Sequence, residues 1–193
     1  MIWNKKPFAW EQHGNSSSNR GGGHAESIPQ SDFEKNSTPS ANEWIRVKLN
    51  KFVDYVSSNL TNEDVNVSGL YDLYDANTLI GKTSVNCIKQ DYITVIKDGA
   101  GVGRIRKLPK NSFFIGTMGA LIPKNNNLDF VFSLLEKVNL SLSFTGTTIP
   151  HIYFKDYGNE FYLIPFLSKE QQKIGRFFAS LDSLVALHQR KQK

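Results

Sequence analysis

The C-terminal stretch, residues 165–193, most constrains how this chain can fold. Pro165 ends the segment before it, and Ser168 stands three residues before Gln171, which is the spacing of a capping box at a helix start. Apolar residues then recur at steps of three and four, so one face of the predicted helix is strongly apolar. They are Ile174, Phe177, Phe178, Leu181, Leu184, Val185 and Leu187. Such a helix needs a surface to lie against, either in its own domain or on another chain.

The composition is that of a globular protein with a mild excess of positive charge. The chain has 193 residues, of which 39% are hydrophobic, and a formal net charge of +5. This length suffices for one domain with a sizeable core. The charge permits an anionic partner such as nucleic acid without demonstrating one. The single cysteine, Cys87, excludes an internal disulfide and a Cys-based zinc site.

No targeting or membrane segment stands out. The first residues carry charge but no apolar core of a signal peptide, and no apolar run approaches the length that spans a bilayer. We therefore expect a cytoplasmic protein that makes no contact with a membrane.

The chain divides into three expected parts. Residues 13–42 are rich in Gly, Ser and Asn and cannot bury enough apolar surface to offset the entropy of ordering. We predict a flexible N-terminal segment over 1–42, a folded domain over 43–165 and a C-terminal helix over 166–193.

The folded part mixes strands and helices. A helical piece is expected over 52–56, and Asn127 is placed to cap a helix over 128–139. Strands are predicted at 69–81 as a strand–turn–strand unit, then at 91–97, 104–108, 113–117, 120–122, 149–154 and 161–164. This mixed order predicts an α+β fold, with a mixed α/β domain followed by the long helix.

A glycine-rich turn separates two of these strands. Gly99, Gly101 and Gly103 have the spacing G-x-G-x-G, and a basic, strand-like run follows them. A dinucleotide-binding loop needs G-x-G-x-x-G at a helix start, and a phosphate-binding Walker loop needs Gly-Lys-Ser/Thr. Two interpretations remain, a plain turn and a backbone that a ligand approaches closely.

Positive charge gathers around this turn. Between residues 97 and 124 the only acidic residue is Asp98. The basic residues are Lys97, Arg104, Arg106, Lys107, Lys110 and Lys124. Alternation along a strand puts Arg104 and Arg106 on one side. These cations either contact phosphates and bases or form a solvated strand face.

A second polar loop runs from Thr145 through Thr147 and Thr148 to His151. Its hydroxyls and backbone amides are able to hold phosphates. The alternative is an ordinary loop with local side-chain-to-backbone bonds.

Signatures of catalysis are missing. The histidines, His13, His24, His151 and His188, show no metal-binding spacing, and no Ser/Asp/Cys arrangement near His151 supports a catalytic triad. No acidic pattern suits a metal-dependent nuclease. We therefore expect binding without an enzymatic activity, a cofactor or a metal.

Four stretches, in order, resemble the specificity subunits of type I restriction–modification systems. They are EWIRVKL from Glu43, GLYDLYDANTLIG at 69–81, YITVIKDGAGVGRI at 92–105, and GTTIPHI at 146–152 followed by the block 165–189. The last block is similar to the opening of the family's conserved spacer helix. The resemblance covers residues 43–193.

The resemblance implies a target-recognition domain that reads one half of a bipartite site in double-stranded DNA. It also implies a coiled-coil-like spacer helix that packs against a second such helix. The resemblance further implies that this helix docks the modification methyltransferase subunit and that the restriction subunit joins through the complex. The implied DNA-proximal residues are Lys97, Gly99, Gly101, Gly103, Arg104, Arg106, Lys107, Thr145, Thr147, Thr148 and His151. The implied subunit interface comprises Ile174, Phe177, Phe178, Leu181, Leu184, Val185 and His188.

The chain departs from the family pattern, because it has one recognition domain and one spacer helix where the family carries two of each. Residues 8–12 resemble the opening of another domain. We therefore expect a truncated or recombined half-subunit that pairs with a second copy or with another specificity subunit. The alternatives are a protein–protein adaptor with a basic soluble face, and an inactive remnant of such a subunit.

Overall fold

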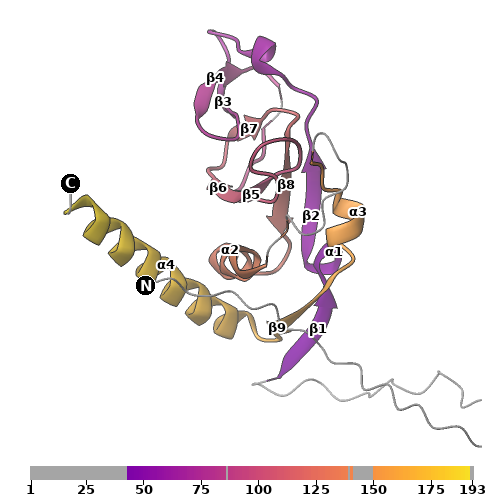
Figure 1. The fold of residues 1–193 in the computed structure, drawn as a ribbon, viewed down its shortest axis with the longest axis vertical. Helices are drawn as coiled ribbons and strands as arrows, with labels where there is room; N and C mark the ends of the chain where they lie inside the picture. The colour runs from indigo at the N-terminus through magenta and orange to yellow at the C-terminus, as the bar shows by residue number, and fades with distance from the viewer. Residues whose placement is uncertain (1–42, 86, 139, 141–149, 192–193) are drawn as a thin grey trace, which may run out of the picture. The chain divides into compact units, whose positions relative to one another are not determined.

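The computed structural model describes residues 43–85, 87–138, 140 and 150–191 (Figure 1). The predicted flexible segment 1–42 lies outside the described residues. In chain order the elements are β1 (Trp44–Lys48), α1 (Leu49–Phe52), β2 (Val53–Ser57), the 3-10 helix η1 (Asn62–Asp64), β3 (Tyr71–Tyr74), β4 (Leu79–Thr83), β5 (Tyr92–Ile96), β6 (Ile105–Leu108), β7 (Ser112–Phe114), β8 (Met118–Pro123), α2 (Leu128–Lys137), α3 (Phe154–Tyr157), β9 (Phe161–Pro165) and α4 (Ser168–Arg190). This mixed order, ending in a long helix, confirms the α+β prediction.

The largest sheet has the strand order β2-β8-β5-β6, with antiparallel neighbours throughout. All of β5 is buried, because each of its faces lies in an apolar cluster. Ile93 and Val95 belong to the cluster that also contains α2 residues, whereas Tyr92 and Ile96 pack with Phe114 of β7. The strand predicted at 91–97 therefore lies at the centre of the domain.

A smaller sheet has the order β4-β3-β7. β3 and β4 form an antiparallel hairpin, as predicted for residues 69–81, and β3 pairs with β7 in parallel. The turn of the hairpin is closed by the Asp75 carboxylate, which accepts the backbone N–H groups of Asn77 at 2.7 Å and Thr78 at 2.6 Å. This hairpin presents the turn 75–78 near β6, where the candidate site lies.

Two local predictions are wrong. Residues 53–57 form the strand β2 because their backbone pairs with β8 from Val53↔Pro123 to Ser57↔Gly119. Residues 149–154 were expected as a strand, but in the described part Phe154 begins the helical turn α3. That turn brings Phe154 and Tyr157 to one side, where Phe154 stacks on Tyr55 with ring centroids 4.6 Å apart.

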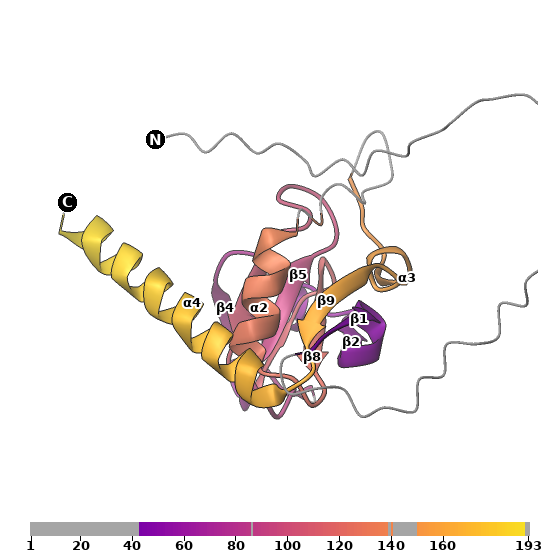
Figure 2. The ribbon, with the colours of Figure 1, turned by 90° about the horizontal axis from the view of Figure 1, so that it is seen from below.

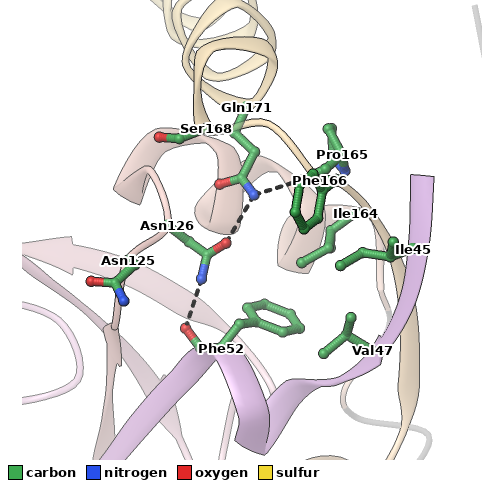
Figure 3. Close-up of a pocket in the computed structure, with 10 residues that line it drawn as sticks. All are labelled: Ile45, Val47, Phe52, Asn125, Asn126, Ile164, Pro165, Phe166, Ser168 and Gln171. Carbon is green, nitrogen blue, oxygen red and sulfur yellow. Dashed lines mark hydrogen bonds between the residues drawn. The ribbon is translucent and has the colours of Figure 1, made fainter. Parts of the chain in front are cut away.

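The start of α4 also differs from the prediction. Its N-cap is Leu167, which makes no side-chain capping bond, and Gln171 does not form a capping box. Gln171 instead points into the domain, where it is 3% exposed and donates to the Pro165 carbonyl oxygen at 3.0 Å and to Asn126 Oδ1 at 2.9 Å (Figure 3). Burial of the amide thus overrides the local capping pattern.

Gln171 lies at a pocket of about 260 Å³ beside the small sheet of β1 and β9. Ile45, Val47 and Ile164 supply apolar side chains to its wall, and Asn126 bonds across it to the Phe52 carbonyl oxygen (Figure 3). The polar groups at this pocket connect α4, the β1–β9 sheet and the segment before α2. The pocket therefore marks the place where α4 is anchored to the domain.

The long helix α4 has two different halves. Its first turns pack beside α2, and the rest runs on past it (Figure 2). Ile174 packs against the main core, Gly175 is buried, and Lys137 of α2 lies 5.0 Å from the ring centroid of Phe178. Residues 181–190 are all exposed. The prediction of a helix that needs a partner therefore applies to its second half.

Candidate nucleic-acid interface

The backbone of the glycine turn requires glycine. Gly99, Gly101 and Gly103 have φ of 80°, 83° and 84°, a left-handed conformation that disfavours every side chain. Gly103 N–H donates to the Ile96 carbonyl oxygen at 2.8 Å, which closes the loop between β5 and β6. A Cβ on Gly99 would meet nothing within 4 Å. The positive φ, and not crowding by neighbours, is therefore the reason for glycine at position 99. The backbone at Gly99 is also open to close approach by a ligand.

The second polar stretch lies alongside this loop. Gly99 N–H donates to the Pro150 carbonyl oxygen at 3.0 Å, and Ile152 N–H donates to the Lys97 carbonyl oxygen at 3.0 Å. These two bonds join segments about fifty residues apart and bring His151 beside Asp98, with which it forms an isolated β-bridge. The structure thus brings Lys97, the glycine loop and His151 together.

His151 is a half-buried hydrogen-bonding partner of Asp98. Burial lowers the pKa of His151 from its ordinary value, and the positive charge of Lys97 lowers it further. The ring donates its Nδ1–H to the Asp98 carboxylate, and the Lys97 Nζ lies 3.9 Å from the other Asp98 oxygen. Asp98 is therefore held between a cation and a donor, which reduces its repulsion of an approaching anion.

The β3–β4 hairpin reaches the same loop through two arginines. Arg104 Nη2 donates to the Ala76 carbonyl oxygen at 2.9 Å and to Asn77 Oδ1 at 2.6 Å. The guanidinium carbon of Arg106 lies 5.1 Å from the ring centroid of Tyr74. These contacts place both arginines on the hairpin side of β6, as the alternation predicts.

Lys107 lies on the opposite face of β6. Its Nζ pairs with the Asp129 carboxylate of α2 at 2.6 Å and lies 4.6 Å from the ring centroid of Phe132. Lys124 pairs with Asp54 of β2 at 3.2 Å. The structure does not bring these two lysines to the glycine loop, so the basic cluster of the sequence divides between two faces.

Some predicted residues cannot be placed, and others were missed. Thr145, Thr147 and Thr148 lie outside the described residues. Sequence reasoning missed Asn77 at the exposed hairpin tip and Tyr153, which is 45% exposed with its ring centroid 4.0 Å from that of His151. The signal for Asn77 was present in the Asp-Ala-Asn-Thr run, which is typical of a turn.

The implied subunit-interface residues also divide. Phe177, Leu181, Leu184 and Val185 are exposed by 60%, 40%, 62% and 56%, and His188 is exposed too. Ile174 and Phe178 are half-buried against the domain. The exposed apolar surface of α4 therefore begins at Phe177.

The described part of the chain shows neither a metal-ion site nor a membrane-spanning helix. No group of three or more His, Cys, Asp or Glu side chains there is arranged to hold a metal ion. Among the same residues, no helix is long and apolar enough to cross a membrane.

Solved structures share this fold. The specificity subunit of a type I restriction–modification system from M. genitalium superposes with a TM-score of 0.59 at 20% identity, over 76% of this chain. A chain from a study of complex assembly and conformational transition of the type I R-M system superposes with a TM-score of 0.65 at 20% identity, over 82% of this chain. The HsdS subunit from Thermoanaerobacter tengcongensis superposes with a TM-score of 0.61 at 18% identity, over 84% of this chain. The match spans only 41 to 43% of those proteins.

Sequence comparison identifies the family. No curated protein sequence matches the chain. A family model described as the type I restriction modification DNA specificity domain matches residues 30–193, which is most of the chain. Such a domain serves recognition rather than catalysis. The chain therefore belongs to the family of type I restriction modification DNA specificity domains.

Proposed function

We propose that this chain binds double-stranded DNA sequence-specifically and reads one half of a bipartite site for a type I restriction–modification enzyme. The carrying observation is the convergence of three separate stretches: the hairpin turn 75–78, the loop 97–104 and residues 150–153. Arg104 joins the first two, and the bond from Gly99 to Pro150 joins the last two. Hydrogen bonds therefore hold three segments that resemble stretches of the family next to one another.

The chemistry of this surface suits a DNA duplex. Lys97 and Arg106 supply positive charge for phosphates, which gives affinity without sequence information. Asn77 at the hairpin tip and His151 supply groups that hydrogen-bond base edges. The bare backbone at Gly99 allows a close approach. The surface thus combines groups for holding the duplex with groups for reading it.

The second half of α4 supports a proposal about assembly. Phe177, Leu181, Leu184, Val185 and Leu187 leave about half of their surface in water. Exposed apolar residues at helical spacing mark a partner-binding face. We propose that this face pairs with the spacer helix of a second copy or of another specificity subunit. The paired helices then dock the modification methyltransferase subunit, and the restriction subunit joins through that complex.

The adaptor hypothesis uses the same helix but makes no use of the glycine loop. Selection from a randomised duplex library, with the chain alone and with its modification subunit, separates the two. DNA recognition predicts an enriched half-site and binding that weakens steeply with salt. Mapping of methylated adenines in cells should then recover that half-site. Absence of any enriched sequence in both selections would contradict DNA recognition, while retained subunit binding would favour the adaptor.

A further inference from the structure

We infer that Arg104 is a positioning residue, which fixes the hairpin turn 75–78 and the orientation of the Asn77 amide. This inference rests on the proposed function, and it assigns to Asn77 the contact with a base. The expectation from sequence was that Arg104 itself touches DNA. Three features of the structure favour the positioning role.

The first feature is the geometry of the contact. One nitrogen of Arg104, Nη2, donates to both the Ala76 carbonyl oxygen and Asn77 Oδ1, at 2.9 and 2.6 Å. The partners are 28 and 27 residues away in sequence and belong to the turn between β3 and β4, in a different sheet from β6. A single guanidinium therefore ties the glycine loop to the hairpin tip.

The second feature is the orientation that this contact imposes on Asn77. Arginine only donates hydrogen bonds, so the oxygen of the Asn77 amide must face it. The Nδ2 donors of Asn77 then lie on the other side of an exposed amide. In the major groove, guanine N7 and O6, adenine N7 and thymine O4 accept hydrogen bonds. The fixed amide is therefore suited to read an acceptor on a base.

The third feature is the stiffness of both supports. The turn backbone is closed by Asp75, whose carboxylate accepts from Asn77 N and Thr78 N, and by the bond from Asp75 N to the Thr78 carbonyl oxygen at 3.0 Å. Arg104 N–H donates to the Gly101 carbonyl oxygen at 2.9 Å, and the Arg104 carbonyl accepts from Ile96 N at 2.9 Å. Arg104 therefore connects two segments whose backbones are already fixed.

A positioning role and a phosphate contact have different consequences. Loss of one phosphate contact weakens binding to all sequences and lowers the salt slope by about 0.9. Loss of the positioning contact from Arg104 to Asn77 leaves the salt slope unchanged and lowers sequence discrimination at one or two base pairs. Lysine restores a phosphate contact but lacks the planar fork of arginine.

The test compares the wild type with Arg104→Lys, Arg104→Ala and Asn77→Asp. In the chain without DNA, we expect both Arg104 variants to shift the NMR signals of the Asn77 side-chain amide and to speed its hydrogen exchange. On selected duplexes, we expect both to lose about fivefold or more of the discrimination at the same base pairs, with an unchanged salt slope. Asn77→Asp keeps an acceptor for Arg104 but lacks the donor, so it should lose the same discrimination.

Each other outcome overturns a stated part. If the Asn77 amide signals do not respond to Arg104→Lys, Arg104 does not position the Asn77 amide, and this conclusion is independent of the DNA-binding results. If Arg104→Ala lowers the salt slope by about 0.9 and lysine restores it, Arg104 is a phosphate contact, and the inference fails while DNA recognition stands. If the wild type selects no sequence although the amide responds, DNA recognition fails, and with it the assignment of Asn77 to a base.

Discussion

Gly175 of α4 lies so close to Asn127, the N-cap residue of α2, that a Cβ built on Gly175 would come within 2.5 Å of Asn127 Oδ1. The same Cβ would be 2.6 Å from Phe130 N, which donates to that oxygen. The two helices therefore meet at the capped end of α2, with no room for a side chain between them. This contact fixes where α4 leaves the domain.

Gly175→Ala tests this contact. Alanine normally stabilises a helix interior by about 0.5–1 kcal/mol relative to glycine. Here we expect the free energy of unfolding to fall by about 1–3 kcal/mol, because the added methyl overpacks the crossing. Urea denaturation measures the change, and Ser180→Ala on the exposed surface of α4 is the control. A gain in stability for Gly175→Ala would show that the helices separate without cost.

Gln171→Ala should destabilise the domain through its buried hydrogen bonds. The variant leaves the Pro165 carbonyl oxygen and the Asn126 side chain without this partner, at a cost of about 1–3 kcal/mol. Gln172→Ala, at the neighbouring position, should change the free energy of unfolding by less than about 0.5 kcal/mol. Equal effects of the two variants would contradict the anchoring role of Gln171.

Leu181→Glu should break assembly without unfolding the domain. Leu181 is 40% exposed and lies where α4 has left the core, whereas Ile174 packs against the core. Ile174→Glu should therefore lower the free energy of unfolding by more than Leu181→Glu does, because it places a charge against the apolar core. Sedimentation with and without the modification subunit measures assembly, and thermal unfolding measures the fold. Loss of the fold in Leu181→Glu would place that residue in the core.

The Glu136 carboxyl of α2 makes the stability of the contact between α2 and α4 depend on pH. Partial desolvation raises the pKa of the exposed Glu136 from its ordinary value, the negative charge of Asp182 on α4 raises it further, and Lys107 opposes this shift. The folded chain thus holds this proton more tightly than the unfolded chain does. Its stabilising contribution is present below the ordinary pKa and is lost as pH rises through the raised one.

Two variants should move this pKa in opposite directions. We expect Asp182→Asn to lower the pKa of Glu136 and Lys107→Ala to raise it. NMR titration of the Glu136 carboxyl carbon measures both values. If the pKa does not respond to Asp182→Asn, α4 does not hold its position beside α2 in solution.

Arg106 and Lys107 form a matched pair for DNA binding, since they are adjacent but lie on opposite faces of β6. Arg106→Ala should weaken binding to duplex DNA by about 1 kcal/mol or more and lower the salt slope by about one. Lys107→Ala should leave both quantities close to those of the wild type, because its ammonium pairs with Asp129. Fluorescence anisotropy over a series of salt concentrations provides the measurement. The reverse ranking would move the DNA to the α2 face.

The elements that sequence predicts well are those whose signal is local. The run 92–96 forms the buried central strand, and Asn127 caps α2 by accepting from Phe130 N at 3.0 Å. The glycine spacing predicts the turn, and φ values near 80° explain it. Each of these features depends on residues within a few positions of one another. Periodicity and backbone preference are therefore sufficient to find them.

The failures share a different cause. Residues 53–57 form a strand because β8 pairs with them. Gln171 forms no capping box because its side chain donates instead to Asn126 and to the Pro165 carbonyl oxygen. In both cases a partner far along the chain outweighs a weak local preference. Local patterns do not contain the position of that partner.

Local patterns in the amino-acid sequence are enough to predict the α+β class, the apolar face of the last helix, the glycine turn and the family likeness. The packing of distant segments sets which cations lie together, since Arg104 and Arg106 face the hairpin and Lys107 faces α2. It also decided where α4 stops being part of the core. The physical reason is that alternation tells which side of a strand a residue occupies, whereas what lies on that side depends on how distant segments pack.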